Sequence, residues 1–147
     1  LQPRIRNQNA ILEIILNTAA RRCEQEAIQL SLEIEDFPMD FLSDMDTTTI
    51  FSNLLDNAID ACMELDRSVK RIEVVLCQKM GLLALRMTNT CQAAADLSPR
   101  QWHSTKKDHM GIGLSNVRKT VEKYHGVVSV RTKEELFQVS VTIPIKS

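Results

Sequence analysis

The stretch NLLDNAIDA, residues 53–61, places three polar side chains on one side of an otherwise apolar helix. With 3.6 residues per turn, Asn53, Asn57 and Asp60 fall within about 60° of one another. An amide oxygen suits Mg²⁺, which takes few protein ligands and leaves its other positions to water and phosphate oxygens. The three side chains could equally face solvent and bind nothing. The stretch therefore predicts a helix with one polar face that is a candidate metal site.

A second stretch, HMGIGLSNV at residues 109–117, holds two of the four glycines of the chain. Small residues at a helix start let backbone N–H groups approach a phosphate at the positive end of the helix dipole. A lone G-x-G could instead be a flexible hinge, but its place after an N-x-x-x-N helix and a long loop is more specific. The sequence contains neither a P-loop nor a strand-linked G-x-G-x-x-G motif, which excludes those two routes to a nucleotide.

The spacing of apolar residues around these stretches predicts three helices and five strands. We expect helices at residues 7–26, 49–65 and about 113–125, and strands at 28–34, 71–78, 82–88, 127–132 and 137–143. The run at residues 46–49 offers N-caps for the second helix, and Gly126 is the residue expected to end the third. Residues 36–46 and 89–110 are expected to be loops, and a loop of about 20 residues tends to be functional. The simplest packing is an α/β two-layer sandwich, a mixed and mostly antiparallel sheet with helices on one face.

Composition limits the class of protein further. The 147 residues, 44% hydrophobic and 25% charged, predict a single globular domain over residues 1–147. A net charge of −1 gives no broad field to attract nucleic acid, so no nucleic-acid partner is expected. The four cysteines form no C-x-x-C pair, which argues against zinc and a disulfide framework. The chain begins at Leu1 and has no apolar run of membrane-spanning length, so we expect a cytoplasmic fragment of a longer protein.

The two stretches resemble the N-box and the second glycine box of the ATP-binding superfamily of gyrase, heat-shock chaperones, histidine kinases and mismatch-repair proteins. The resemblance extends from about residue 9 to residue 144 and is closest to the catalytic domain of membrane-bound sensor histidine kinases. The patterns at residues 28–34, 53–61, 104–106 and 109–114 are most similar to those of quorum-sensing peptide-pheromone receptor kinases. The resemblance implies a Bergerat-type sandwich that binds ATP between its helices and a mobile lid.

The resemblance also implies roles for single residues of the first stretch. Asn57 matches the asparagine that coordinates Mg²⁺, and Asn53 matches the N-box position one turn earlier. In the ATPases of the superfamily that earlier position is a glutamate acting as general base on water. An asparagine has no basic carboxylate, so Asn53 favours a kinase over a hydrolase.

Phosphate and lid contacts are implied by the second stretch and by the residues before it. Positive charge near the phosphates would come from the lid, with Lys106 counted beside Asn53 and Asn57 as a candidate catalytic residue. Asp60 stands where many kinases carry Lys or Arg. The resemblance assigns phosphate binding to Gly111, Ile112, Gly113 and Leu114, and the lid cations are Lys106, Lys107 and His109.

The first glycine box of the family is missing. Asn89 stands after the predicted strand at 82–88, where the family has an aspartate that accepts a hydrogen bond from the adenine amino group. An asparagine amide can accept that bond and also donate to a ring nitrogen. Asn89 is therefore the predicted adenine-binding residue.

The resulting functional hypothesis is a domain that binds Mg²⁺ and ATP and transfers the γ-phosphoryl group to a histidine on a separate dimerisation helix. Its expected partners are the upstream phosphoacceptor helices of the same protein, a second copy in a full-length homodimer, and a response regulator. We expect it to be the cytoplasmic domain of a plasma-membrane protein. Two alternatives stay open: a degenerate regulatory module that no longer binds nucleotide, and a stand-alone serine kinase or anti-sigma factor.

Overall fold

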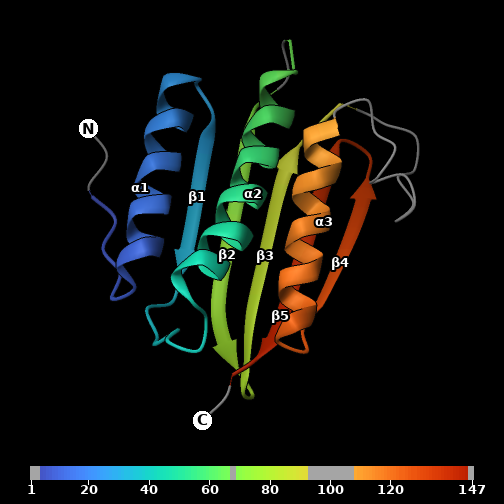
Figure 1. The fold of residues 1–147 in the computed structure, drawn as a ribbon. Helices are drawn as coiled ribbons and strands as arrows, with labels where there is room; N and C mark the ends of the chain where they lie inside the picture. Colours follow the sequence, from blue (N-terminus) through green and yellow to red (C-terminus); the bar gives the residue numbers. More distant parts are fainter. Residues whose placement is uncertain (1–3, 67–68, 93–107, 146–147) are drawn as a thin grey trace.

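A computed structural model of the chain describes residues 4–66, 69–92 and 108–145. Within these residues, three helices and five strands follow one another in the predicted order (Figure 1). They are α1 (Ala10–Gln25), β1 (Gln29–Ile34), α2 (Asp44–Met63), β2 (Arg71–Lys79), β3 (Leu82–Thr90), α3 (Asp108–Lys123), β4 (Val127–Lys133) and β5 (Leu136–Pro144). None of the helices described is long and apolar enough to cross a membrane.

The strands form one sheet in the order β1-β2-β3-β5-β4. β1 is parallel to β2, whereas the β2–β3, β3–β5 and β4–β5 pairs are antiparallel. The three helices cover one face of this sheet, with α2 between α1 and α3 (Figure 1). The predicted α/β sandwich with a mixed sheet is thereby confirmed. Of the lid that the resemblance places at residues 104–109, residues 104–107 lie outside the described part of the chain, and Asp108 and His109 begin α3.

The core lies between the helices and the inner face of the sheet. Every second side chain of the central strands is buried, because alternate residues of a strand point to opposite faces. The same alternation places Asn89 on the inner face at the end of β3. The largest contributors on β2 and β3 are Ile72, Val74, Leu76, Leu83, Leu85 and Met87, and the helices add Leu12, Leu16, Phe51 and Leu55.

Helix α2 begins five residues earlier than the predicted start at Thr49. Ser43 is the N-cap, and its side chain accepts a hydrogen bond from the backbone N–H of Asp46 at 3.0 Å. The Thr47 and Thr48 hydroxyls donate to carbonyls one turn back, so these residues lie inside the helix. The predicted cap within residues 46–49 is wrong because Ser43 satisfies the exposed N–H groups first.

Two connections, the turn between β2 and β3 and the end of α3, contain residues with positive φ. Met80 and Gly81 both have positive φ, 54° and 78°, which matches the tight turn that closes the β2–β3 hairpin. After α3, His125 takes the left-handed conformation, not the predicted Gly126. Gly126 is required for another reason, because a Cβ atom there would lie 2.5 Å from the carbonyl oxygen of Thr142.

Candidate functional site

The candidate site lies where α3 passes α2. A Cβ atom at Gly113 would lie 3.5 Å from Oδ1 of Asn53 and 3.5 Å from Nδ2 of Asn57. The missing side chain of Gly113 therefore leaves both amides of the predicted metal face directly beside the backbone of α3. The structure thus brings together two residues of the first stretch and one of the second.

Asn57 is the unusual member of this group. Its residue is 6% exposed, and its Nδ2 atom is fully buried with no hydrogen-bond partner among the residues described. Leaving a buried polar group without a partner costs about 1–3 kcal/mol. Groups of this kind in folded proteins mark strain, a functional role or a missing ligand.

Asn53 is half-buried and differently satisfied. Its Nδ2 donates to the carbonyl oxygen of Thr49 at 2.8 Å, one turn back on α2. The atom of Asn53 that approaches Gly113 is therefore the acceptor Oδ1. Two amides one turn apart offer oxygen atoms that suit a divalent cation with few protein ligands, while the Nδ2 of Asn57, unpartnered among the described residues, is a donor that suits an anionic group such as a phosphate.

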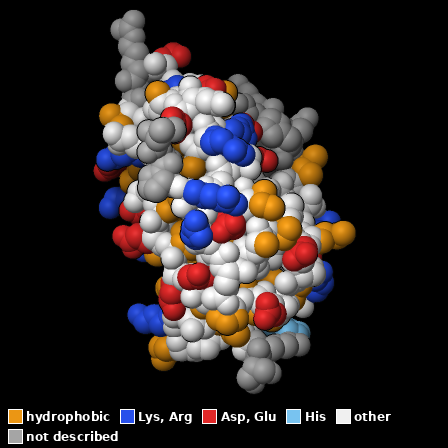
Figure 2. Space-filling view, turned by 90° about the vertical axis from the view of Figure 1, so that its left-hand side faces the viewer, with side chains coloured by type: hydrophobic (Ala, Val, Ile, Leu, Met, Phe, Trp, Pro, Cys, Tyr) orange, Lys and Arg blue, Asp and Glu red, His pale blue; other side chains and the backbone are white. Residues whose placement is uncertain are grey.

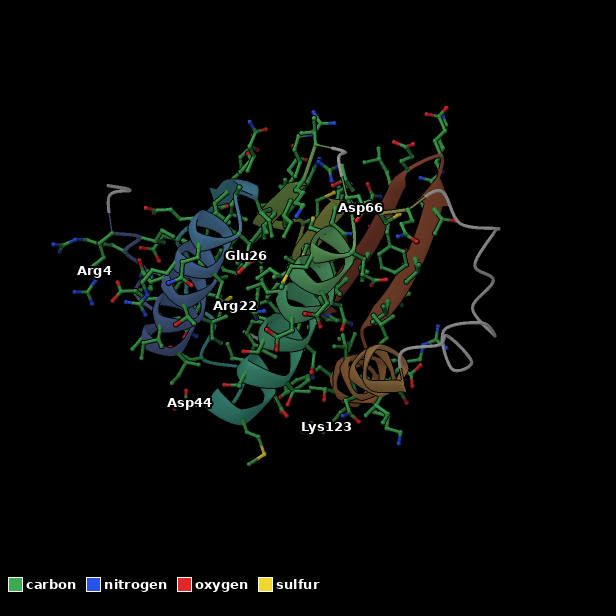
Figure 3. All side chains as sticks on the ribbon, turned by 90° about the horizontal axis from the view of Figure 1, so that it is seen from above. Arg4, Arg22, Glu26, Asp44, Asp66 and Lys123 are labelled. Atoms are coloured by element: carbon green, nitrogen blue, oxygen red, sulfur yellow. The ribbon has the colours of Figure 1, made fainter. Side chains whose placement is uncertain are left out.

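Asp60 does not share the seam between α2 and α3. Its Oδ1 lies 3.9 Å from Arg22 of α1, and Asp56 accepts a 3.0 Å hydrogen bond from the same guanidinium. Figure 3, seen from above, shows Arg22 between α1 and α2. The predicted single polar face is therefore divided, because α2 has a neighbour on each side: the asparagines face α3 and the aspartates face α1.

Ion pairs are interspersed on the flank that carries α1, where acidic and basic side chains lie side by side (Figure 2). Burial raises the pKa of Asp56, while the Arg22 guanidinium acts in the opposite direction. No cluster of three or more His, Cys, Asp or Glu side chains that could hold a metal occurs among the described residues. A cation at Asn57 would therefore depend on amide oxygens, water and a bound phosphate.

Asn89 lies apart from the two asparagines of α2. It is 4% exposed at the end of β3, between Ile72 and Phe137 on the neighbouring strands. Its Nδ2 donates to the carbonyl oxygen of Thr90 at 3.0 Å. A cavity of about 280 Å³ at this end of the sheet is lined in part by Asn89 and Thr90, but neither Asn53 nor Asn57 lines it.

The predicted phosphate-binding and lid residues lie partly inside and partly outside the described part of the chain. Lys106 and Lys107 lie outside it, while His109 and Gly111 fall in the first turn of α3. Ile112 is 61% exposed on α3. Leu114 is only 2% exposed and packs in the core, and its N–H lies beyond the first turn of α3, so its predicted role in phosphate binding does not fit the helix. Since α3 begins at Asp108 instead of the predicted 113, the two glycines lie within the helix and not before it.

A second polar cluster, which no motif in the sequence indicates, lies at the opposite end of the same seam. Asp46 of α2 accepts hydrogen bonds from the Tyr124 hydroxyl and from Lys123, the latter at 2.7 Å, and its side chain is 9% exposed. The Tyr124 ring also meets Phe41 edge-on, with centroids 6.4 Å apart. Figure 3 shows Lys123 where α3 approaches α2. Equal spacing is the one sequence feature that fits this cluster. Asp46 precedes Asn57 by eleven residues and Gly113 precedes Tyr124 by eleven, so two antiparallel helices in contact at Asn57 and Gly113 would also bring Asp46 and Tyr124 together.

Asp46 is a charged member of this cluster at neutral pH. Burial alone would raise its pKa, but hydrogen bonds from neighbouring side chains, chiefly Lys123 and Tyr124, outweigh burial. They hold the pKa of Asp46 below the ordinary value of 3.8. The pKa of Lys123 is raised in turn by its bond to Asp46.

Comparison with solved structures gives the class of this fold. The chain superimposes on the Acinetobacter baumannii histidine kinase AdeS with a TM-score of 0.71 and 14% identity, covering 94% of this chain and 64% of that one. For the catalytic domain of histidine kinase ThkA the TM-score is 0.71 at 17% identity, over 95% and 93% of the two chains. The mycobacterial sensor histidine kinase MprB gives 0.67 at 17% identity, over 91% and 95%. The fold is that of histidine kinase catalytic domains.

Residues 42–144 match the GHKL domain, so the chain belongs to this family. The match covers α2, the glycine stretch and the strands that follow it, which are the elements of the candidate site. No curated protein sequence matches the chain. Family and fold together support an ATP-binding enzyme of the kinase or ATPase type.

Proposed function

We propose that this domain binds ATP with Mg²⁺ and transfers the γ-phosphoryl group to a histidine on a separate dimerisation helix. The observation that carries the proposal is the buried, unpartnered amide of Asn57 beside Gly113. Asn57 would hold the cation through Oδ1, and Mg²⁺ would supply charge neutralisation at the phosphates. With Oδ1 on the cation, Nδ2 of Asn57 would donate to a phosphate oxygen, which gives this buried N–H group the partner that it lacks among the described residues of the free protein.

The remaining residues would orient the nucleotide. Asn53 presents Oδ1 to the same space, where it can accept a hydrogen bond from a cation-bound water. The free backbone N–H groups of the first turn of α3, residues 108–111, would approach the phosphates, and Gly113 within the helix would let α3 lie close to Asn57. Asn89 would accept from the adenine amino group, and Lys106 would add positive charge from the lid.

A kinase fits the site better than a hydrolase. Water activation requires a basic group near the γ-phosphate, and Asn53 has no carboxylate to serve as one. The nearby aspartates of α2, Asp56 and Asp60, are turned toward Arg22. This arrangement also disfavours the serine-kinase and anti-sigma branch, which usually keeps an acidic residue at the position of Asn53.

The partners follow from this proposal. The acceptor histidine would lie on upstream helices of the same protein, which would dimerise, and a response regulator would receive the phosphoryl group. We propose further that the parent protein is a quorum-sensing peptide-pheromone receptor in the plasma membrane, with this domain on the cytoplasmic side. The sequence resemblance at residues 53–61 and 109–114 supports that assignment.

Calorimetric titration with Mg²⁺ and a non-hydrolysable ATP analogue tests the binding step. We expect saturable binding by the wild type and none by Asn57→Ala. Asp56→Asn is the matched control, because Asp56 is the preceding residue on α2 but faces α1. Absence of binding by the folded wild type would favour the degenerate module, and equal binding by Asn57→Ala would remove Asn57 from the site.

A second assay tests the transfer step. The domain is mixed with radiolabelled ATP and with the upstream helix pair of the parent protein. We expect acid-labile, base-stable phosphate on the helix protein and little ATP hydrolysis by the domain alone. Robust hydrolysis, or labelling of a serine, would contradict the histidine-kinase assignment.

A further inference from the structure

The Asp46 cluster and the Asn57–Gly113 contact lie at two points along one seam. Eleven residues are close to three helical turns, so Asp46 and Asn57 lie within about 20° of each other on α2, about 16 Å apart along the axis. Tyr124 and Gly113 have the same relation on α3. The two helices run in opposite directions (Figure 1). Tyr124 therefore contacts Asp46 at one end of the seam, and Gly113 lies beside Asn57 toward the other end.

We propose that Asp46, through Lys123 and Tyr124, holds α3 in register against α2 and thereby sets the affinity of the nucleotide site at Asn57. The inference rests on the proposed function and adds a positioning residue to it. Asp46 lies about three helical turns from Asn57 and would act on the nucleotide only through α3.

Directional bonds fix the register of α3 more sharply than the apolar part of the seam does. Helix α3 buries Leu114, Val117 and Val121, which form one apolar stripe. Apolar burial depends on the area removed from water and not on direction. Hydrogen bonds lose strength steeply with distance and angle, and more so where burial lowers the local dielectric. The Asp46 side chain, 9% exposed, is buried in this way.

The cluster also has more contacts than one ion pair at the protein surface would provide. The backbone N–H of Asp46 is bound to Ser43, whose own N–H donates to the Tyr124 hydroxyl at 3.4 Å. Lys123 lies over the Tyr124 ring, 5.4 Å from its centroid. The first turn of α2 and the last turn of α3 are thus joined through both side chain and backbone.

The nucleotide site is sensitive to small displacements of α3. A methyl group at Gly113 would already be in van der Waals contact with both amides, at 3.5 Å. A misplacement of about 1 Å can cost an active site about a hundredfold in rate. A change of register at the Asp46 end would therefore move the backbone of Gly113 relative to Asn57 by an amount that matters.

The affinity test uses Mg²⁺ with a non-hydrolysable ATP analogue, at a temperature where every variant is folded by circular dichroism. We expect Asp46→Asn and Lys123→Gln to bind about fivefold more weakly than the wild type. Lys123→Arg, which keeps the cation, should restore near wild-type affinity. Asp56→Asn removes a carboxylate charge that accepts a hydrogen bond of similar length at the other side of α2, and it should leave affinity unchanged. If Asp46→Asn does not fold, Tyr124→Phe replaces it in the test, because it removes the hydroxyl and keeps the ring contact with Phe41. We expect it also to bind the analogue more weakly than the wild type.

Hydrogen exchange measures the register without nucleotide. In Asp46→Asn, amides of α3 from Leu114 to Val121 should exchange faster, while α1 exchanges as in the wild type. Faster exchange confined to the last turn of α3, or equal nucleotide affinity in wild type and Asp46→Asn, would overturn the register role while leaving the proposed function intact. A folded wild type that binds no nucleotide would overturn both.

Discussion

Replacing Asn57 with leucine should make the free protein more stable and remove its response to nucleotide. Leucine has nearly the shape of asparagine but no polar atom to leave unsatisfied. Asn57 is 6% exposed with a buried, unpartnered Nδ2 in the described structure, so the substitution removes a penalty of about 1–3 kcal/mol. A gain near the middle of that range corresponds to a rise of about 4–8 °C in Tm for a chain of 147 residues.

Calorimetric unfolding with and without Mg²⁺ and an ATP analogue separates the two effects. The wild type should gain about 2.7 kcal/mol at a ligand concentration of one hundred times Kd. Asn57→Leu should have a higher Tm than the wild type without ligand and should gain no stability when the ligand is added. Asn53→Leu is the matched control: Asn53 is half-buried and its Nδ2 is bonded to Thr49, so leucine there should give no rise in Tm without ligand.

Two results would refute this reasoning. A variant less stable than the wild type would mean that the Asn57 amide is satisfied in the folded protein, for instance by a bound water. A variant that still gains stability from the nucleotide would mean that the cation is held elsewhere.

Three other perturbations test separate parts of the structure. Gly126→Ala should lower the free energy of unfolding in urea by about 1–3 kcal/mol, because its Cβ would lie 2.5 Å from the Thr142 carbonyl; an unchanged midpoint would contradict that contact. Asp46→Asn should lower stability at neutral pH. The folded pKa of Asp46 is depressed, so its contribution to the free energy of unfolding is fully present above pH 3.8 and is lost as pH falls below that value. The difference in stability between Asp46→Asn and the wild type should therefore narrow below pH 3.8, and a difference that stays constant with pH would mean that the charge is not involved. Iodoacetamide at neutral pH should label half-exposed Cys77 before Cys23, whose pKa burial raises to about 11, and mass spectrometry of the peptides would show the reverse order if burial does not control reactivity.

The fold was accessible from the sequence because its elements are strongly patterned. Strict alternation on β2 and β3 and the polar stripe of α2 both report local periods, which tertiary packing did not change. The start of α3 was predicted late because glycine is a poor helix former in isolation. In the folded protein, burial of Leu114 and the approach of Gly113 to α2 favour an earlier start.

The candidate site was predicted in part. Periodicity brought Asn53 and Asn57 to one face, but it could not show that Asp60 would turn to Arg22, because that depends on α1 lying beside α2. Asp46 was interpreted as part of an N-cap run, which is the common use of an aspartate at a helix start. Its partners Lys123 and Tyr124 lie far along the chain, and no local pattern reports such a contact.

The parallel pairing of β1 with β2 bears on the order in which this domain folds. The β2–β3 hairpin closes across Met80 and Gly81 and needs only a short loop to form. Gln29 pairs with Arg71, and all of α2 lies between them, so β1 can add to the sheet only after a much larger loop has closed. Loop closure costs entropy before any contact compensates for it. Thr90 and Leu136 of the β3–β5 pair are similarly far apart along the chain. We therefore expect the β2–β3 hairpin to be protected before both β1 and β5 join it in pulse-labelled refolding, with high φ-values in the hairpin and low ones on β1.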